Sequence, residues 1–103
     1  MRYSRGVLPN NVAEYVIEGD FTIFFLNNIK VEIEKDISTN KISYFTFDLK
    51  KVNYIDSAAI SLLIMAGKYN DSKGKKLVLK NPSDVVKRII DNAELSFIEY
   101  QYE

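Results

Sequence analysis

The fold is decided by the stretch Ile42–Met65, ISYFTFDLKKVNYIDSAAISLLIM. Its first part, Ile42–Phe47, is rich in aromatic and β-branched residues, which is typical of a strand. We expect a short polar turn at Lys50 and Lys51, after which the chain returns briefly to the core. The apolar run that begins at Ser57 predicts a helix that is buried over most of its circumference.

The residue before this helix is suited to cap it. Asp56 can accept hydrogen bonds from the free backbone N–H groups of the first turn, so we expect it to be the N-cap. Ser57 is then the first helical residue, and its hydroxyl lies beside the positive end of the helix dipole. A phosphate group is well tolerated at such a place. The sequence therefore predicts one serine next to one carboxylate on a rigid turn.

The segments before this stretch predict a hairpin. Tyr3–Leu8 and Val12–Glu18 have the composition of strands, and the residues Pro9–Asn11 between them are a turn signal. We expect Gly19 and Asp20 to end the second strand.

An amphipathic helix is predicted next. Its apolar residues recur at spacings of three and four, at Leu26, Ile29, Ile33 and Ile37. We expect Thr22 to be its N-cap and the segment Ser38–Lys41 to close it. The aromatic residues around its first turn are expected to pack in the core; they are Phe21, Phe24 and Phe25.

Two glycines mark the helix that begins at Ser57. Gly67 lies inside it, where glycine costs about 1 kcal/mol relative to alanine, so we expect a close backbone contact at this position. Gly74 is suited to the position just after the C-terminus of the helix.

The last third of the chain predicts a strand, a helix and a short strand. Lys75–Lys80 has the apolar centre of a strand in a buried parallel sheet. Asn81 is expected to be the N-cap of the last helix and Pro82 its first residue. Phe97–Tyr100 is expected to be the final strand. The order β-β-α-β-α-β-α-β predicts an α/β fold with right-handed crossovers.

Composition limits the classes of function. Lysine plus arginine and aspartate plus glutamate number 14 each, so the zero net charge gives no electrostatic case for nucleic acid or an acidic membrane as a partner. There is no cysteine and no histidine, which excludes disulfides, a thiol nucleophile, a Ser-His-Asp triad and imidazole or thiolate zinc ligands. A lysine or carboxylate base stays open, but we expect no enzyme. There is no P-loop or glycine-rich phosphate cradle, so we also expect no cofactor and no metal.

Length and hydropathy predict one soluble domain. The 103 residues suffice for a single compact domain, residues 1–103. No apolar run approaches the roughly 20 residues of a membrane helix. Met1–Arg5 is not followed by the apolar segment of a signal peptide, so we expect a cytoplasmic location and no membrane insertion.

Three segments, in the right order, resemble the STAS domain of sulfate transporters and anti-sigma factor antagonists. Val52–Leu63 is similar to the antagonists' signature of a hydrophobic residue, Asp-Ser-Ser/Thr-Gly and an aliphatic run. Glu18–Thr22 resembles the start of the family's first helix, and Asn81–Leu95 looks like its last major helix. The resemblance covers nearly the whole chain and implies a mixed sheet of four to five strands with helices packed on it.

The resemblance also implies a function. In anti-sigma factor antagonists, the serine after the aspartate is phosphorylated by a partner anti-sigma kinase, and the dephosphorylated form binds that partner and frees a sigma factor. Carried over, this implies Ser57 as phosphoacceptor, with an anti-sigma factor or serine kinase, and a phosphatase, as partners. The residues implied for partner binding are Asp56, Ser57, Ala58, Ala59, Ser61 and Thr22. Ala58 and Ala59 depart from the family's Ser or Thr and Gly, and Thr22 stands where the family has an aspartate.

Two alternatives stay open. The chain can be a STAS scaffold that is not phosphorylated, in a stress-signalling assembly or resting on a transporter ATPase, and Ala58 and Ala59 favour that interpretation. A receiver domain that is phosphorylated on Asp48 needs clustered acids at strand ends, and the first strands offer no acid pair.

Overall fold

The computed structural model describes residues 1–103 and contains one sheet of five strands in the order β1-β2-β3-β4-β5. The strands are β1 (Arg2–Leu8), β2 (Val12–Phe21), β3 (Tyr44–Ile55), β4 (Leu77–Lys80) and β5 (Ile98–Gln101). The helices are α1 (Asn27–Thr39), α2 (Ser57–Ser72) and α3 (Asp84–Asn92). The predicted order β-β-α-β-α-β-α-β and the α/β class are confirmed.

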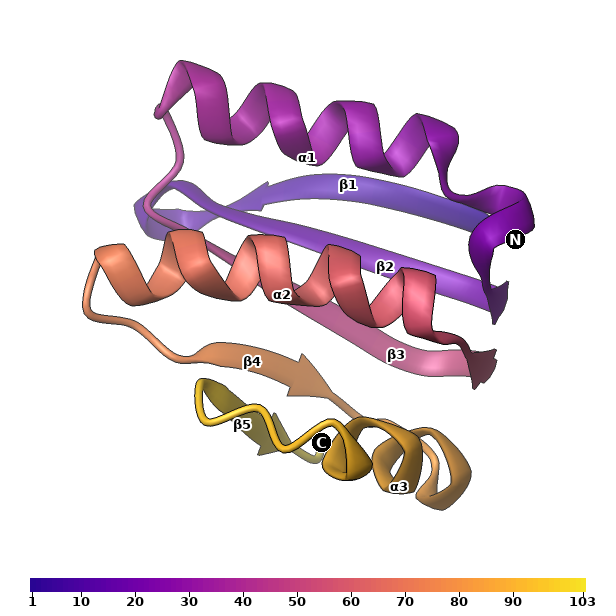
Figure 1. Ribbon diagram of the computed structural model, residues 1–103. Helices are drawn as coiled ribbons and strands as arrows, with labels where there is room; N and C mark the ends of the chain where they lie inside the picture. The colour runs from indigo at the N-terminus through magenta and orange to yellow at the C-terminus, as the bar shows by residue number, and fades with distance from the viewer.

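The sheet is mixed. β1 and β2 form an antiparallel hairpin around the short 3-10 turn Pro9–Asn11, whereas β2, β3, β4 and β5 are parallel neighbours. Figure 1 shows α1 and α2 side by side over one face of the sheet, with α3 beyond the end of β4. Because the parallel strands all run the same way, their first residues gather at one end of the sheet and their last residues at the other. Any site that depends on strand ends therefore lies at one of these two ends.

The core lies between the sheet and the helices. Along β2, alternate side chains point to the helices and are fully buried, namely Ala13, Tyr15 and Ile17. β3 adds Phe45, Phe47 and Leu49, and α2 covers them with its own buried residues Ala59, Leu62, Leu63 and Ala66. This alternation is the period of two that a sheet with one covered face requires. None of the three helices has both the length and the apolar character needed to cross a membrane.

A partly buried ion pair ties α1 to the hairpin. Asp36 accepts hydrogen bonds from Arg5 Nε at 3.0 Å and Arg5 Nη2 at 2.6 Å, and the Tyr15 hydroxyl donates to the same carboxylate at 2.6 Å. Burial raises the pKa of Tyr15, and its hydrogen bond to Asp36 raises that pKa further. Every buried side-chain polar atom in the protein has a hydrogen-bond partner, so this network is fully satisfied.

Two strands are longer than the sequence predicts. The expected turn at Lys50 and Lys51 is wrong, because β3 continues through both residues to Ile55. The polar residues instead form a bulge, where the pairing with β2 shifts register and Asp48 Oδ1 accepts a hydrogen bond from the Lys50 N–H at 3.0 Å. β2 likewise passes Gly19, whose φ of 92° glycine adopts without strain, and ends at Phe21.

Two of the predicted helix caps are also wrong. Thr22 makes no capping hydrogen bond, and a 3-10 turn (Ile23–Phe25) separates it from α1. Asn81 does not cap α3, because it has a φ of 55° and its side chain accepts a hydrogen bond from the Glu103 N–H at 2.7 Å. Ser83 is the N-cap instead, with its hydroxyl accepting from the Val86 N–H at 3.2 Å, so α3 begins at Asp84.

A close contact is present at Gly67, but its partner is a side chain and not the backbone of a neighbouring element. Gly67 is buried in α2, and a Cβ at this position would overlap the ring of Phe97, which packs against the helix from the other end of the chain. Gly74 follows the end of α2 with a φ of 71°, as expected for the residue after a helix C-terminus.

We expect Gly67→Ala to lower the free energy of unfolding by about 1–3 kcal/mol, because the added methyl must displace a packed ring. The helix propensity of alanine alone would raise it by about 1 kcal/mol. Urea denaturation of wild type, Gly67→Ala, Phe97→Ala and the double variant measures the coupling energy between the two positions. An equal effect of Gly67→Ala in the two backgrounds would show that the contact with Phe97 does not limit this position.

Candidate functional site

The candidate site lies where two neighbouring parallel strands end. β2 ends at Phe21 and β3 at Ile55, and these two residues are paired in the sheet. The Asp56 N–H continues the pairing by donating to the Phe21 carbonyl at 3.3 Å. The turn after β2 and the start of α2 are therefore held next to each other, although they are more than thirty residues apart in sequence.

The Asp56 carboxylate joins these two turns. Its Oδ1 accepts a hydrogen bond from the Ala59 N–H at 3.0 Å, which confirms the predicted N-cap of α2. Its Oδ2 accepts from the Ile23 N–H at 2.9 Å in the turn after β2. The second bond was not predicted, because local sequence gives no sign that Ile23 lies within reach. One ionised side chain thus satisfies a free backbone donor on each side.

Ser57 is the first residue of α2 and is exposed, as predicted. Its hydroxyl has no hydrogen-bond partner within the protein. Ser61 lies one turn further along, also exposed, with its hydroxyl donating to the Ser57 carbonyl at 3.1 Å. Ala58 is half-buried, whereas Ala59 is fully buried in the core. A partner that approaches this turn therefore meets Ser57 and Ser61, with the Ala59 methyl facing the interior.

An exposed apolar turn lies beside Ser57. Ile23, Phe24 and Phe25, which we call the aromatic ridge, are 63%, 86% and 50% exposed. The prediction that Phe24 and Phe25 pack in the core is therefore wrong, and of the three clustered phenylalanines only Phe21 is buried. The half-buried Thr22 precedes the ridge.

The aromatic ridge concentrates exposed hydrophobic side chains in one segment of the protein. Together with Tyr54 at the end of β3, it supplies four of the eight exposed large hydrophobic side chains of the chain. Single exposed apolar side chains need no explanation, but a contiguous group of them marks interaction surfaces. The Ile23 backbone is linked to the α2 cap through Asp56, so the start of the ridge and the start of α2 are held at the same end of the sheet.

Asp48 has a different environment. It lies inside β3, on the face of the sheet that the helices leave open, and its carboxylate accepts from the Lys50 N–H in the bulge. No group of three or more aspartate, glutamate, histidine or cysteine side chains is placed so that it could hold a metal ion. The arrangement of clustered acids at strand ends that a receiver domain requires is therefore absent.

Comparison with known proteins identifies the family. Residues 7–102 match the STAS domain, which is nearly the whole chain. The protein belongs to the STAS domain family, in agreement with the mixed sheet and the Asp-Ser turn at the start of α2.

Solved structures with the same fold include well-aligned relatives of low sequence identity. A candidate anti-sigma factor antagonist from Thermotoga maritima superposes with a TM-score of 0.82 at 17% identity, over 98% of this chain and 86% of that one. The phosphorylated form of the Bacillus cell-fate determinant SpoIIAA superposes with a TM-score of 0.79 at 13% identity, over 99% of this chain and 93% of that one. A serine-to-glutamate variant of RsbS from Moorella thermoacetica superposes with a TM-score of 0.76 at 15% identity, over 100% of this chain and 88% of that one.

Substitutions at Asp56 test whether its carboxylate holds the two turns together. Asparagine has one acceptor oxygen and caps helices about as well as aspartate, so Asp56→Asn should keep the bond to Ala59 and lose the bond to Ile23. Asp56→Ala should lose both, at a cost of about 1–2 kcal/mol in the free energy of unfolding.

Amide hydrogen exchange provides the measurement. We expect faster exchange at Ile23 in both variants, and faster exchange at Ala59 only in Asp56→Ala. Unchanged exchange at Ile23 in both variants would contradict the proposed link between the ridge and the helix cap.

Proposed function

We propose that this protein is a non-enzymatic regulatory module of the anti-sigma factor antagonist type. It binds an anti-sigma factor that is also a serine kinase, and phosphorylation of Ser57 switches the complex off. The observation that carries the proposal is the exposed, unpartnered Ser57 hydroxyl at the N-terminus of α2 in a STAS fold. SpoIIAA, which shares the fold, is an anti-sigma factor antagonist with structures in both phosphorylated and unphosphorylated forms.

The geometry supports a switch that leaves the fold unchanged. Phosphorylation adds a charge of about −1.5 to −2 at neutral pH. At Ser57 this charge lies beside the positive end of α2, which favours it by about 0.3–1 kcal/mol and offsets part of the repulsion from Asp56. The side chain is exposed, so the free protein does not have to desolvate the phosphate.

The bound state is affected much more than the free protein. A partner that covers the turn must desolvate the phosphate and the adjacent Asp56 carboxylate together, which costs several kcal/mol. About 1.4 kcal/mol corresponds to a tenfold change in affinity. A single phosphate can therefore end binding without a conformational change.

The aromatic ridge supplies the affinity in this proposal. Aromatic residues that are exposed in the free protein and buried in a complex often dominate binding energy. The Ile23–Asp56 bond holds the start of the ridge next to the start of α2, which supports a partner that contacts both Ser57 and the ridge.

A STAS scaffold that is not phosphorylated is the second candidate. It is favoured by Ala58 and Ala59, which place two methyl groups where the antagonists usually have a serine or threonine and then a glycine. The two candidates differ at Ser57. A scaffold keeps its partner when Ser57 carries a negative charge, whereas in a phosphorylation switch the same charge ends partner binding.

Phosphate mapping and binding measurements test the role of Ser57. We expect the cognate anti-sigma kinase to place one phosphate on Ser57 and none on Ser61, as read by tandem mass spectrometry. Ser57→Asp should weaken binding of that kinase at least tenfold in calorimetry, and Ser57→Ala should preserve it. Ser61→Asp is the matched control, one turn away on the same face, and should weaken binding less. Modification elsewhere with Ser57 untouched would defeat the assignment, and equal affinity of Ser57→Asp and wild type would favour the scaffold.

The ridge is tested separately with Phe24→Ala and Phe25→Ala. Truncating both exposed side chains should weaken partner binding by about 2 kcal/mol or more, while the free energy of unfolding changes by no more than about 0.5 kcal/mol. Val31 is an exposed apolar residue on α1, outside the ridge, and serves as the control. Val31→Ala should change neither the affinity for the partner nor the free energy of unfolding. Undiminished affinity of the double variant would show that the partner contacts Ser57 without covering the ridge.

A further inference from the structure

A basic basin lies at the opposite end of the sheet from Ser57. It is a cavity of about 580 Å³, formed where the β1–β2 turn, the α1–β3 link and the α2–β4 link meet. We call this cavity the lysine basin. The residues that line it are Asn10, Asn40, Lys41, Ile42, Ser43, Tyr44, Lys73 and Lys75. α2 has 16 residues, so its length of about 24 Å separates the basin from Ser57. The basin is therefore distinct from the candidate regulatory surface.

The basin carries positive charge that the protein does not neutralise. Three of its eight lining residues are lysines and none is acidic. Lys41, Lys73 and Lys75 take part in none of the six ion pairs of the structure, which use other cations.

Helix dipoles account for only part of this charge. α1 and α2 both end at the basin, and a helix C-terminus carries roughly half a negative charge. The two ends together offset about one lysine, so about two positive charges remain. Asp71 and Lys76 flank the lining residues in sequence and carry opposite charges, so together they leave this sum unchanged. The surplus is therefore more than the fold needs.

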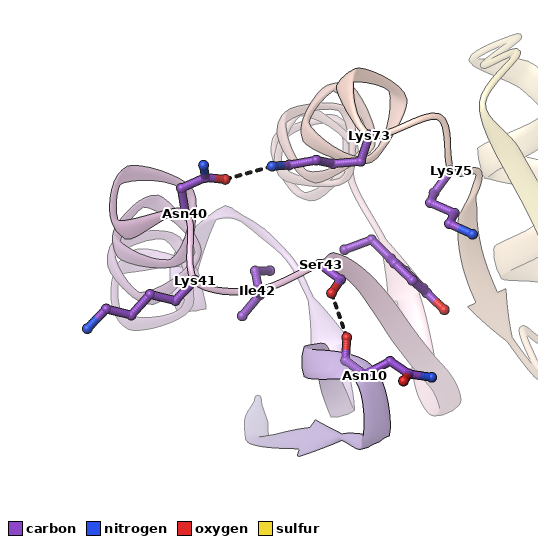
Figure 2. Close-up of a pocket in the computed structure, with 8 residues that line it drawn as sticks. Asn10, Asn40, Lys41, Ile42, Ser43, Lys73 and Lys75 are labelled. Carbon is purple, nitrogen blue, oxygen red and sulfur yellow. Dashed lines mark hydrogen bonds between the residues drawn. The ribbon is translucent and has the colours of Figure 1, made fainter.

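Hydrogen bonds within the walls fix the shape of the basin. Lys73 Nζ donates to Asn40 Oδ1 at 2.8 Å, and the Tyr69 hydroxyl donates to the same oxygen at 2.8 Å. On the other wall, the Ser43 hydroxyl donates to the Asn10 carbonyl at 2.5 Å and the Ser43 N–H to the Asn11 carbonyl at 2.8 Å. Figure 2 shows Lys73 reaching to Asn40 across the top, Ser43 joined to Asn10 below, and Lys41 extending outward at the rim.

The aromatic side chains add a second feature. Lys75 Nζ lies 5.6 Å from the centroid of the half-buried Tyr44 ring, and Lys73 Nζ lies 5.2 Å from that of Tyr69. These contacts hold two ammonium groups near the cavity, and an ammonium has three N–H donors, so Lys73 keeps donors for a further acceptor beside its bond to Asn40. Lysine ammonium groups bind phosphate as compact point charges.

We propose that the lysine basin binds a small phosphorylated metabolite that carries at least two negative charges. The cavity volume lies within the range of about 300–1,000 Å³ usual for small-molecule sites. Its polar lining and charge surplus favour an anion. The inference does not depend on the regulatory role of Ser57.

Titration of the ¹⁵N-labelled protein with inorganic pyrophosphate, at ionic strength held constant with sodium chloride, tests the proposal. We expect saturable shifts of the amide signals of Asn10, Lys41, Ser43 and Lys75, and none at Ser61. Shifts that do not saturate, or that are spread over the surface, would overturn it.

Variants and a second probe make the test specific. Lys41→Gln combined with Lys75→Gln should weaken pyrophosphate binding at least tenfold, and both side chains are exposed, so the fold should be unaffected. Lys30→Gln combined with Lys68→Gln removes two exposed lysines elsewhere and should change the affinity less than twofold. Equal weakening by the two double variants would overturn the site. Binding to phosphatidylglycerol vesicles without saturable pyrophosphate binding would also overturn it, in favour of a lipid surface.

Discussion

The parallel pairing of β2 with β3 is the constraint on which the rest of the structure depends. It places Phe21 opposite Ile55, so that two strands end side by side and each continues into a turn. Asp56 follows one of these strands and has two carboxylate oxygens, enough to accept one N–H from each turn. The exposed serine and the exposed aromatic residues are brought together by this single side chain. Neither group alone would define a surface of useful size.

The position of α2 on the sheet rests on a second, buried interaction. Asn70 Oδ1 accepts from the Phe45 N–H at 2.8 Å, and its Nδ2 donates to the Phe45 carbonyl at 2.9 Å. The pairing of β3 with β4 begins only at the next residue, Thr46, so Asn70 takes the place of a strand neighbour. A buried backbone group left unpaired costs about 1–3 kcal/mol, so this amide fixes α2 against the start of β3. Asp56 fixes the other end of the same helix.

Sequence reasoning identified the features that depend on residues close together in the chain. The Asp56 cap and the order of the elements follow from spacings of a few residues, whereas at Gly67 the glycine inside a helix indicated a close contact but not its partner Phe97, 30 residues away. The errors occur where a distant partner decides the outcome. Asn81 is a good N-cap by composition, but the backbone N–H of Glu103 takes its side-chain oxygen and α3 begins later. Phe24 is hydrophobic, which predicts a place in the core, yet it is exposed in a turn whose Ile23 N–H is bonded to a residue 33 positions away.

The two ends of α2 lie beside groups of opposite charge. Its N-terminus, with free N–H groups and a partial positive charge, favours Asp56 and would favour a phosphate on Ser57. Its C-terminus carries the opposite partial charge and lies beside Lys73 and Lys75. At the first end the helix dipole reduces the cost of adding negative charge, so the free protein can accept a phosphate without unfolding. At the second end the lysines exceed what the dipole can neutralise, so this end of the helix is the one suited to an anion from outside the chain.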